Sequence, residues 1–114
     1  MQLDDILEYN NSVALFGMNL SKTQKDMILS LGVTDVCIAL DKQYERITLE
    51  NNEDEPTQEF LQYKQNVLRI ADMLREYCNV YAIYDDIGVL DYKDSPSDKG
   101  AETWNILYKR KELI

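Results

Sequence analysis

Histidine is absent from this sequence of 114 residues, and cysteine occurs only twice, at Cys37 and Cys78. The two cysteines do not form a C-x-x-C pair, so the ligand pattern of a structural zinc site is missing. Cys37 lies inside an apolar run and Cys78 at the end of an amphipathic one, as is typical of free thiols in a reducing cytosol. The composition therefore argues against a zinc-binding domain.

Positive charge and long apolar runs are also scarce. Lysine and arginine number 12 against 21 acidic residues, and a net charge of −9 argues against a chain that grips nucleic-acid phosphates by itself. No apolar run approaches the length of a membrane span, and residues 1–5 lack the basic region of a signal peptide. We therefore predict a cytoplasmic protein without a membrane partner.

The pattern that is present is an alternation of short apolar runs with helical periodicity. It predicts a single α/β domain over residues 1–114, with a largely parallel sheet of three to four strands flanked by helices. The expected strands are 12–16, 33–40 and 79–84. The expected helices are 21–32, with a capping box from Ser21 and Gln24, then 56–78 and 102–113, and residues 3–9 are expected to be the last turns of another helix. We expect the acidic segment 50–55 to be a loop.

An acidic loop at residues 93–100, Lys-Asp-Ser-Pro-Ser-Asp-Lys-Gly, combines a rigid turn with two carboxylates. Ser95 can cap a helix whose first residue is Pro96, and Asp98 can complete the capping box. This interpretation does not explain Asp94 or the Lys99-Gly100 pair. The loop therefore also invites a ligand-binding interpretation.

Further carboxylates follow the predicted strands. Asp41 ends the run 33–40, and Asp85 and Asp86 follow the run 79–84. Because the carboxyl ends of parallel strands meet at one edge of a sheet, we expect these side chains near the loop 93–100. Oxygen ligands without histidine or cysteine favour Mg²⁺ or Mn²⁺. Alternatively, Asp41 only ends a strand, and Asp85 and Asp86 only solvate a turn. For Asp85 and Asp86 we favour this structural interpretation, and for Asp41 both interpretations stay open.

Residues 39–45, Ala-Leu-Asp-Lys-Gln-Tyr-Glu, and the loop 93–100 occur in this order and are separated by a long helix and a strand. Together they resemble the Toprim domain of DnaG-like bacterial and phage DNA primases, and the resemblance covers nearly the whole chain. It implies a three-layer, Rossmann-like α/β fold and a site for metal-dependent nucleotidyl transfer. The implied Mg²⁺ or Mn²⁺ ligands are Asp41, Asp94 and Asp98, with Gln43, Lys42 and Lys99 as neighbours.

The sequence departs from the Toprim pattern in two places. Gln43 stands where the family has the second aspartate of an Asp-x-Asp pair, and the strand carrying the family's catalytic glutamate would precede Met1. We therefore expect the C-terminal part of a Toprim domain, with weak or absent metal binding and no activity alone. In the parent enzyme the resemblance implies RNA primer synthesis in DNA replication, with a DNA template and nucleotides as partners.

A second hypothesis is a non-catalytic, phage-derived acidic domain that binds the replication machinery. Such a domain would act through its surface charge or through the sheet edge that a missing first strand leaves exposed. An exposed edge pairs readily with another strand, so a homodimer or a partner strand is expected there. A receiver-like phosphoacceptor domain fits less well, because Asp41 and the acidic pair Asp85-Asp86 come in the wrong order.

Overall fold

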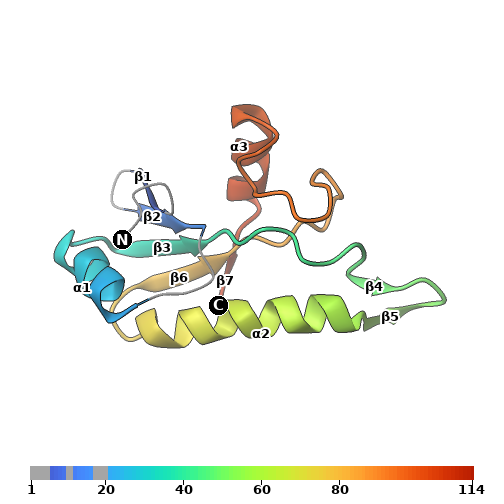
Figure 1. The fold of residues 1–114 in the computed structure, drawn as a ribbon, viewed down its shortest axis with the longest axis horizontal. Helices are drawn as coiled ribbons and strands as arrows, with labels where there is room; N and C mark the ends of the chain where they lie inside the picture. The colour runs from blue at the N-terminus through green and yellow to red at the C-terminus, as the bar shows by residue number, and fades with distance from the viewer. Residues whose placement is uncertain (1–5, 10–11, 17–20) are drawn as a thin grey trace.

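The computed structural model describes residues 6–9, 12–16 and 21–114. Within these ranges the chain forms a five-stranded sheet of order β1-β2-β3-β6-β7, a separate β4-β5 hairpin and three helices (Figure 1). The strands are β1 (Ile6–Tyr9), β2 (Ser12–Leu15), β3 (Asp35–Ile38), β4 (Thr48–Leu49), β5 (Asn52–Pro56), β6 (Asn79–Ala82) and β7 (Glu112–Leu113). The helices are α1 (Lys22–Ser30), α2 (Gln58–Leu74) and α3 (Ala101–Lys109).

The centre of the sheet is parallel. Strand β3 pairs in parallel with β2 on one side and with β6 on the other, while β1 and β7 pair antiparallel at the outside. Helix α1 connects β2 to β3, and α2 connects β3 to β6. The prediction of a mixed α/β fold with a mostly parallel sheet is therefore confirmed.

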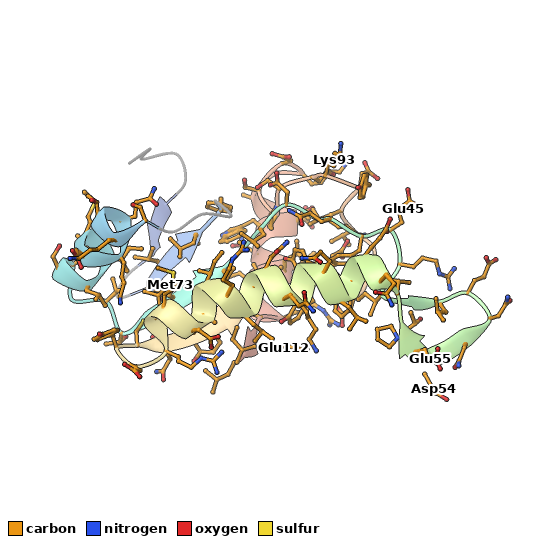
Figure 2. All side chains as sticks on the ribbon, turned by 60° about the horizontal axis from the view of Figure 1, so that its bottom comes forward. Glu45, Asp54, Glu55, Met73, Lys93 and Glu112 are labelled. Atoms are coloured by element: carbon orange, nitrogen blue, oxygen red, sulfur yellow. The ribbon has the colours of Figure 1, made fainter. Side chains whose placement is uncertain are left out.

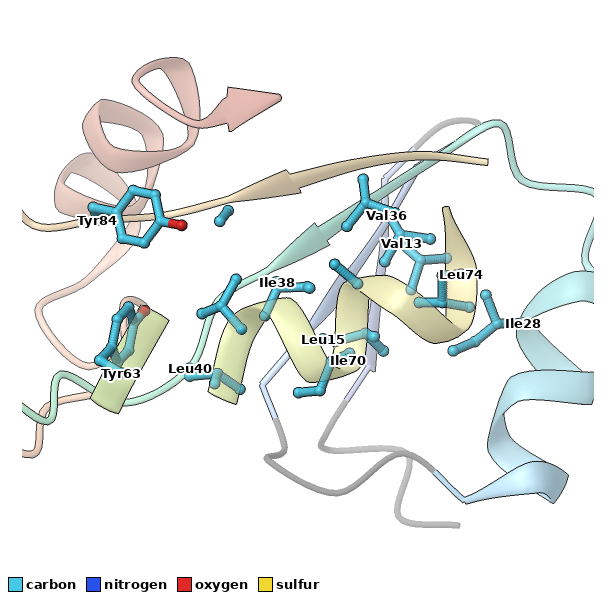
Figure 3. Close-up of a cluster of buried hydrophobic side chains, with 14 of the residues drawn as sticks. Val13, Leu15, Ile28, Val36, Ile38, Leu40, Tyr63, Ile70, Leu74 and Tyr84 are labelled. Atoms are coloured by element: carbon cyan, nitrogen blue, oxygen red, sulfur yellow. The ribbon is translucent and has the colours of Figure 1, made fainter. Parts of the chain in front are cut away.

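Alternating residues of the central strands build two cores. Val36 and Ile38 belong to the core shared with α1 and α2, whereas Cys37 belongs to the core shared with α3. Helices α1 and α2 accordingly cover one face of the sheet and α3 covers the other (Figure 1). Figure 3 shows the larger core, where Ile28 of α1 and Ile70 and Leu74 of α2 surround the strands.

Helix α3 closes the second face with Trp104 and Leu107. Small side chains at Ala14 and Ala39 lie in the same buried cluster, which lets the large indole ring pack close to the sheet. None of the helices in the described ranges has the length and apolar character that crossing a membrane requires.

The prediction for residues 3–9 is wrong over Ile6–Tyr9. These residues form β1, which pairs antiparallel with β2 so that Tyr9 lies opposite Ser12. A stripe of a few apolar residues is too short to define a helix, and pairing along β2 decides the conformation. Residues 3–5 lie outside the described residues. The side of β2 that faces away from β3 is occupied by β1.

The region before α2 also differs from the prediction. Residues 50–55, expected as a loop, belong to the β4-β5 hairpin and its turn. Pro56 ends β5, where a proline is tolerated at a sheet edge, and Thr57 is the N-cap of α2. The Thr57 hydroxyl accepts from the Phe60 amide at 3.2 Å and donates to the Arg46 carbonyl at 2.6 Å. Thr57 therefore starts the helix and fixes it to the segment before the hairpin.

The end of the last helix was predicted too far along the chain. Helix α3 ends at Lys109, and Glu112 and Leu113 form β7 beside β6. Lys109 lies in the last turn of α3, where a cation interacts favourably with the helix dipole. The chain reverses after Arg110 because the sheet offers the edge of β6 as a partner.

Candidate functional site

Asp41 lies where the chain leaves β3 at the carboxyl edge of the sheet. Ala39 and Leu40 continue the buried run beyond the strand, and Asp41 is the first exposed residue after them. The amide of Ala39 still donates to the Leu15 carbonyl, at 2.7 Å, so the backbone stays fixed up to this point. The apolar strand thus delivers a carboxylate to a defined place, as the sequence predicted.

The two motifs identified in the sequence meet at this edge. The amide of Lys42 donates to the Asp94 carbonyl at 2.8 Å, and the amide of Lys93 donates to the Lys42 carbonyl at 2.7 Å. Burial raises the pKa of the Asp41 carboxyl, and repulsion by Asp98 and Asp94 raises it further. The structure therefore brings Asp94 and Asp98 within electrostatic reach of Asp41.

The carboxylates of the acidic loop already have partners within the loop or just before it. Asp94 accepts from the Asp91 amide at 2.9 Å, and Asp98 accepts from the Ser95 amide at 2.8 Å. Lys99 lies 2.7 Å from Asp91 and 3.5 Å from Asp94. In the part of the chain that the structure describes, no group of three or more Asp, Glu, His or Cys residues could hold a metal ion as it stands. The metal ligands therefore remain a prediction.

The prediction that Ser95 caps a helix beginning at Pro96 is wrong. Residues 95–98 form a turn, closed by a 2.9 Å bond from the Asp98 amide to the Ser95 carbonyl, and α3 begins at Ala101 with Gly100 as its N-cap. Gly100 adopts a φ of +97°, a conformation that side chains disfavour. The helix therefore starts where the backbone can turn and not at the proline.

Asp85 has a structural role that the sequence interpretation missed, since we expected it to solvate a turn. It is buried, and its carboxylate accepts from the Lys42 ammonium at 2.9 Å and from the amides of Val89 and Leu90 at 3.0 and 2.8 Å. Burial raises the pKa of Asp85, but these hydrogen bonds outweigh it and lower the pKa. The Lys42 ammonium, expected beside the metal ligands, is thus bound to Asp85 and to the Leu90 carbonyl.

The pairing register contains the signal for this contact. Ile38 of β3 lies opposite Ala82 of β6, so the segments that follow the two strands leave the sheet side by side. Lys42 and Asp85 lie at similar distances beyond that pair, and opposite charges there are expected to meet. Asp86 is exposed and pairs with Arg110, with Nη2 and Oδ2 2.7 Å apart.

A groove of about 720 Å³ opens beside Asp41. Helix α2 contributes Gln58, Glu59 and Gln62, and the segments after β3 and β6 contribute the remaining lining residues, Asp41, Gln43, Tyr92 and Lys93. In the view of Figure 2, Lys93 lies on the same side of α2 as Glu45, near the first half of the helix. The acidic edge therefore borders a space of the size of a small-molecule site.

Comparison with known proteins finds one similar protein that is prophage-derived. No family model matches it, and no solved structure matches it. It is 44% identical over 105 residues, which is 91% of this chain, to the SPbeta prophage-derived uncharacterized protein YorJ of Bacillus subtilis (strain 168). The chain spans 27% of the length of that relative. A phage-derived relative thus shares most of this α/β domain within a longer protein.

Proposed function

We propose that this chain is a Toprim-like domain of a larger phage-derived replication protein, and that the larger protein makes RNA primers by metal-dependent nucleotidyl transfer. The observation that carries the proposal is the pair of backbone hydrogen bonds joining Lys42 to Lys93 and Asp94. They join the segment that follows Asp41 to the loop that contains Asp94 and Asp98, which supports the shared site that the resemblance to primases implies. The longer prophage relative supports a phage origin and leaves room for the other parts of such an enzyme.

The chemistry of the edge suits a hard divalent cation. All three candidate ligands offer carboxylate oxygens, and Asp41 is accessible to solvent. Partial burial, Asp98 and Asp94 raise the pKa of its carboxyl group. A cation held by Asp41, Asp94 and Asp98 would relieve that repulsion and would neutralise substrate phosphates. Mg²⁺ is commonly bound through one or two carboxylates together with substrate phosphates, so an incomplete set of protein ligands is consistent with this role.

The residues predicted to neighbour the metal ligands would have different roles. Gln43 accepts a hydrogen bond from Asn66 at 3.2 Å and contributes a neutral side chain where the family has a carboxylate. Lys99 balances Asp91 and Asp94. The glutamate of the family has no counterpart in the matched motifs, so we propose that the 114-residue chain alone does not make primers.

Manganese titration followed by NMR tests the proposal site by site. Paramagnetic Mn²⁺ should broaden the amide signals of residues 41–43 and 94–98 first, and Asp41→Asn should weaken that broadening. Asp54→Asn is the matched control, because it removes an exposed carboxylate from the β4-β5 hairpin. Broadening that is uniform, or strongest at the hairpin, would contradict the proposal.

A primer assay tests the second half of the proposal. The 114-residue chain, a single-stranded template, ribonucleotides and Mn²⁺ should give no RNA product, whereas the longer relative should give one. The Asp41→Asn and Asp94→Asn variants of the longer protein, numbered as in this chain, should lose that product. Robust synthesis by the 114-residue chain would contradict this half of the proposal.

A second candidate function is binding of a basic replication protein without catalysis. The β4-β5 hairpin projects from the body of the molecule beyond the start of α2 (Figure 1), and all five residues of β5 are exposed. It contains Glu53, Asp54 and Glu55 in succession. The triple variant E53Q/D54N/E55Q should then lose binding to purified replication proteins of the host while its Mn²⁺ response is unchanged.

Light scattering would show whether the chain forms a homodimer, for which the outer edges of β1 and β7 are the candidate surfaces.

A further inference from the structure

The groove beside Asp41 is lined by three kinds of side chain that can contact a ligand. Gln58 and Gln62 present amides from the first turns of α2, Tyr92 presents an aromatic ring, and Lys93 presents a cation. The volume of about 720 Å³ lies within the range of small-molecule sites. Its contents suit a ligand with a flat polar ring and a negative group.

The amides of the groove are held in place from behind. Gln62 donates to the buried Asn66 at 3.3 Å, and Asn66 donates to Gln43 at 3.2 Å, so the amides of three residues form a chain from α2 to the segment after β3. This chain orients the Gln62 side chain, whose nitrogen points to Asn66. An oriented amide can recognise the edge of a nucleobase, which presents both hydrogen-bond donors and acceptors.

Tyr92 is half exposed, at 48%, at the rim of the groove. The next residue, Lys93, has a φ of +71°, which a lysine adopts at a cost. Hydrogen bonds within the turn and to Lys42 hold it there. The ammonium of Lys93 lies 5.7 Å from the centre of the Tyr92 ring. The strained turn therefore presents an aromatic surface with a positive charge beside it.

We propose that this groove binds the base and sugar of a nucleotide, with the base against Tyr92 and its edge toward Gln58 and Gln62. This inference rests on the proposed function and extends it, because the phosphates would then lie toward Lys93 and the cation at Asp41. Stacking on an aromatic side chain is a sequence-tolerant way to hold a base. Amides at the base edge add hydrogen-bonding selectivity.

The charges around the groove predict that a nucleoside triphosphate needs a metal for binding and that an uncharged nucleoside does not. Asp41 and Glu59 line the groove together with a single cation, Lys93, so a bare triphosphate meets net negative charge. A divalent cation reverses that balance, and the nucleotide is therefore expected to bind with the metal. An uncharged nucleoside lacks the phosphates and is expected to bind without metal, although weakly. The two probes separate the groove from the metal site.

NMR titration with each of the four ribonucleosides, without metal, tests the groove alone. At millimolar concentrations at least one nucleoside should shift the Tyr92 ring signals and the side-chain amide signals of Gln58 and Gln62. Tyr92→Ala should weaken this binding about fivefold or more. Tyr77→Ala is the matched control, because Tyr77 is 57% exposed and lies outside the groove. Gln62→Ala should also weaken this binding, and Gln65→Ala is its matched control, since both residues are exposed on α2.

The outcomes distinguish this inference from the proposed function. Nucleoside binding that depends on Tyr92, without any Mn²⁺ response at Asp41, would support the groove and refute the metal site. A Mn²⁺ response at Asp41 with no shift for any nucleoside would do the reverse. Equal effects of Tyr92→Ala and Tyr77→Ala would overturn the groove proposal. A nucleoside triphosphate with Mg²⁺ should bind at least about tenfold more tightly than the nucleoside if both sites exist.

Discussion

The ammonium of Lys42 and the carboxylate of Asp85 meet inside the protein, 2.9 Å apart and with side chains 6% and 1% exposed. This buried ion pair joins the segments that follow β3 and β6, and it lies directly beside the candidate site. Lys42 also donates to the Leu90 carbonyl, and Asp85 also accepts from two amides, so each charge has several partners. The pair fixes the backbone from which Asp41 extends.

Lys42→Met should lower the free energy of unfolding by about 3 kcal/mol, because it leaves a buried carboxylate without its counterion. The double variant K42M/D85N should cost less than the two single variants together. Arg110→Met is the control, since it breaks the exposed pair with Asp86 and should cost less than about 1 kcal/mol. Urea denaturation measures all four. Equal losses of stability for Lys42→Met and Arg110→Met would contradict a large contribution of the buried Lys42–Asp85 pair to the free energy of unfolding.

The same pair predicts a pH dependence. The pKa of Asp85 is lowered in the folded protein by its hydrogen bonds, against the effect of burial. The stability it contributes is therefore present above the ordinary carboxyl pKa of about 4 and is lost as pH falls through the folded value. The stability difference between wild type and Asp85→Asn should shrink over that acidic range. A difference that stays constant on acidification would contradict this assignment.

Asp41 should behave in the opposite sense. Burial, Asp98 and Asp94 raise its pKa, so its ionisation opposes folding as pH rises from the unfolded value through the folded one. Asp41→Asn should therefore stabilise the metal-free protein at neutral pH, by less than about 1 kcal/mol because the group is exposed. The gain should disappear in acid. Thermal unfolding at several pH values, with Asp54→Asn as the control, measures it.

Removing the hydroxyl group from either of two neighbouring tyrosines should change the stability of the protein differently. Tyr63 donates to the Ile83 carbonyl at 2.9 Å, whereas the buried hydroxyl of Tyr84 has no hydrogen-bond partner among the described residues. Their rings lie 6.0 Å apart in the core (Figure 3). Tyr63→Phe should cost about 1 kcal/mol, and Tyr84→Phe should be neutral or stabilising by up to about 1 kcal/mol. The reverse order in urea denaturation would contradict the assignment.

Backbone strain gives a further pair of variants. Gly100→Ala should destabilise the protein by about 1 kcal/mol or more, because the φ of +97° at the start of α3 suits glycine. Lys93→Gly should relieve strain at φ +71° and stabilise the protein by up to about 1 kcal/mol. The groove proposal adds that Lys93→Gly weakens binding of a metal-nucleotide complex. A gain in stability without any loss of binding would confirm the backbone strain at Lys93 and contradict its role in binding the metal-nucleotide complex.

The sequence predicted the central architecture well because local and long-range signals agree there. Val36 and Ile38 lie in a continuous apolar run, and Ser21 with Gln24 forms the expected capping box, with bonds of 3.0 and 3.1 Å. A strand buried on both faces and a helix with a complete cap leave few alternatives. The prediction that Asp41 lies near the loop 93–100 followed from the parallel order of the strands.

The failures occur where pairing between distant segments decides the structure. Ile6–Tyr9 and Glu112–Leu113 become strands because the outer sides of β2 and β6 provide partners, which local periodicity does not reveal. Ser95-Pro96 has the chemistry of a helix start, yet the chain remains in a turn there, and α3 begins only after its N-cap Gly100. The burial of Asp85 depends on Lys42 in the segment after β3, a distant contact that the residues around Asp85 do not reveal.

The position of β3 between two parallel neighbours has a consequence for how fast the protein folds. Asp35 pairs with Ser12 on one side and with Asn79 on the other, so each pairing requires a complete helical connection to close first. Chains dominated by such distant contacts fold slowly, because the entropy of loop closure is lost before the contacts form. A nascent chain that has not yet supplied β6 would leave the apolar edge of β3 open, at the step where association with other chains competes with folding.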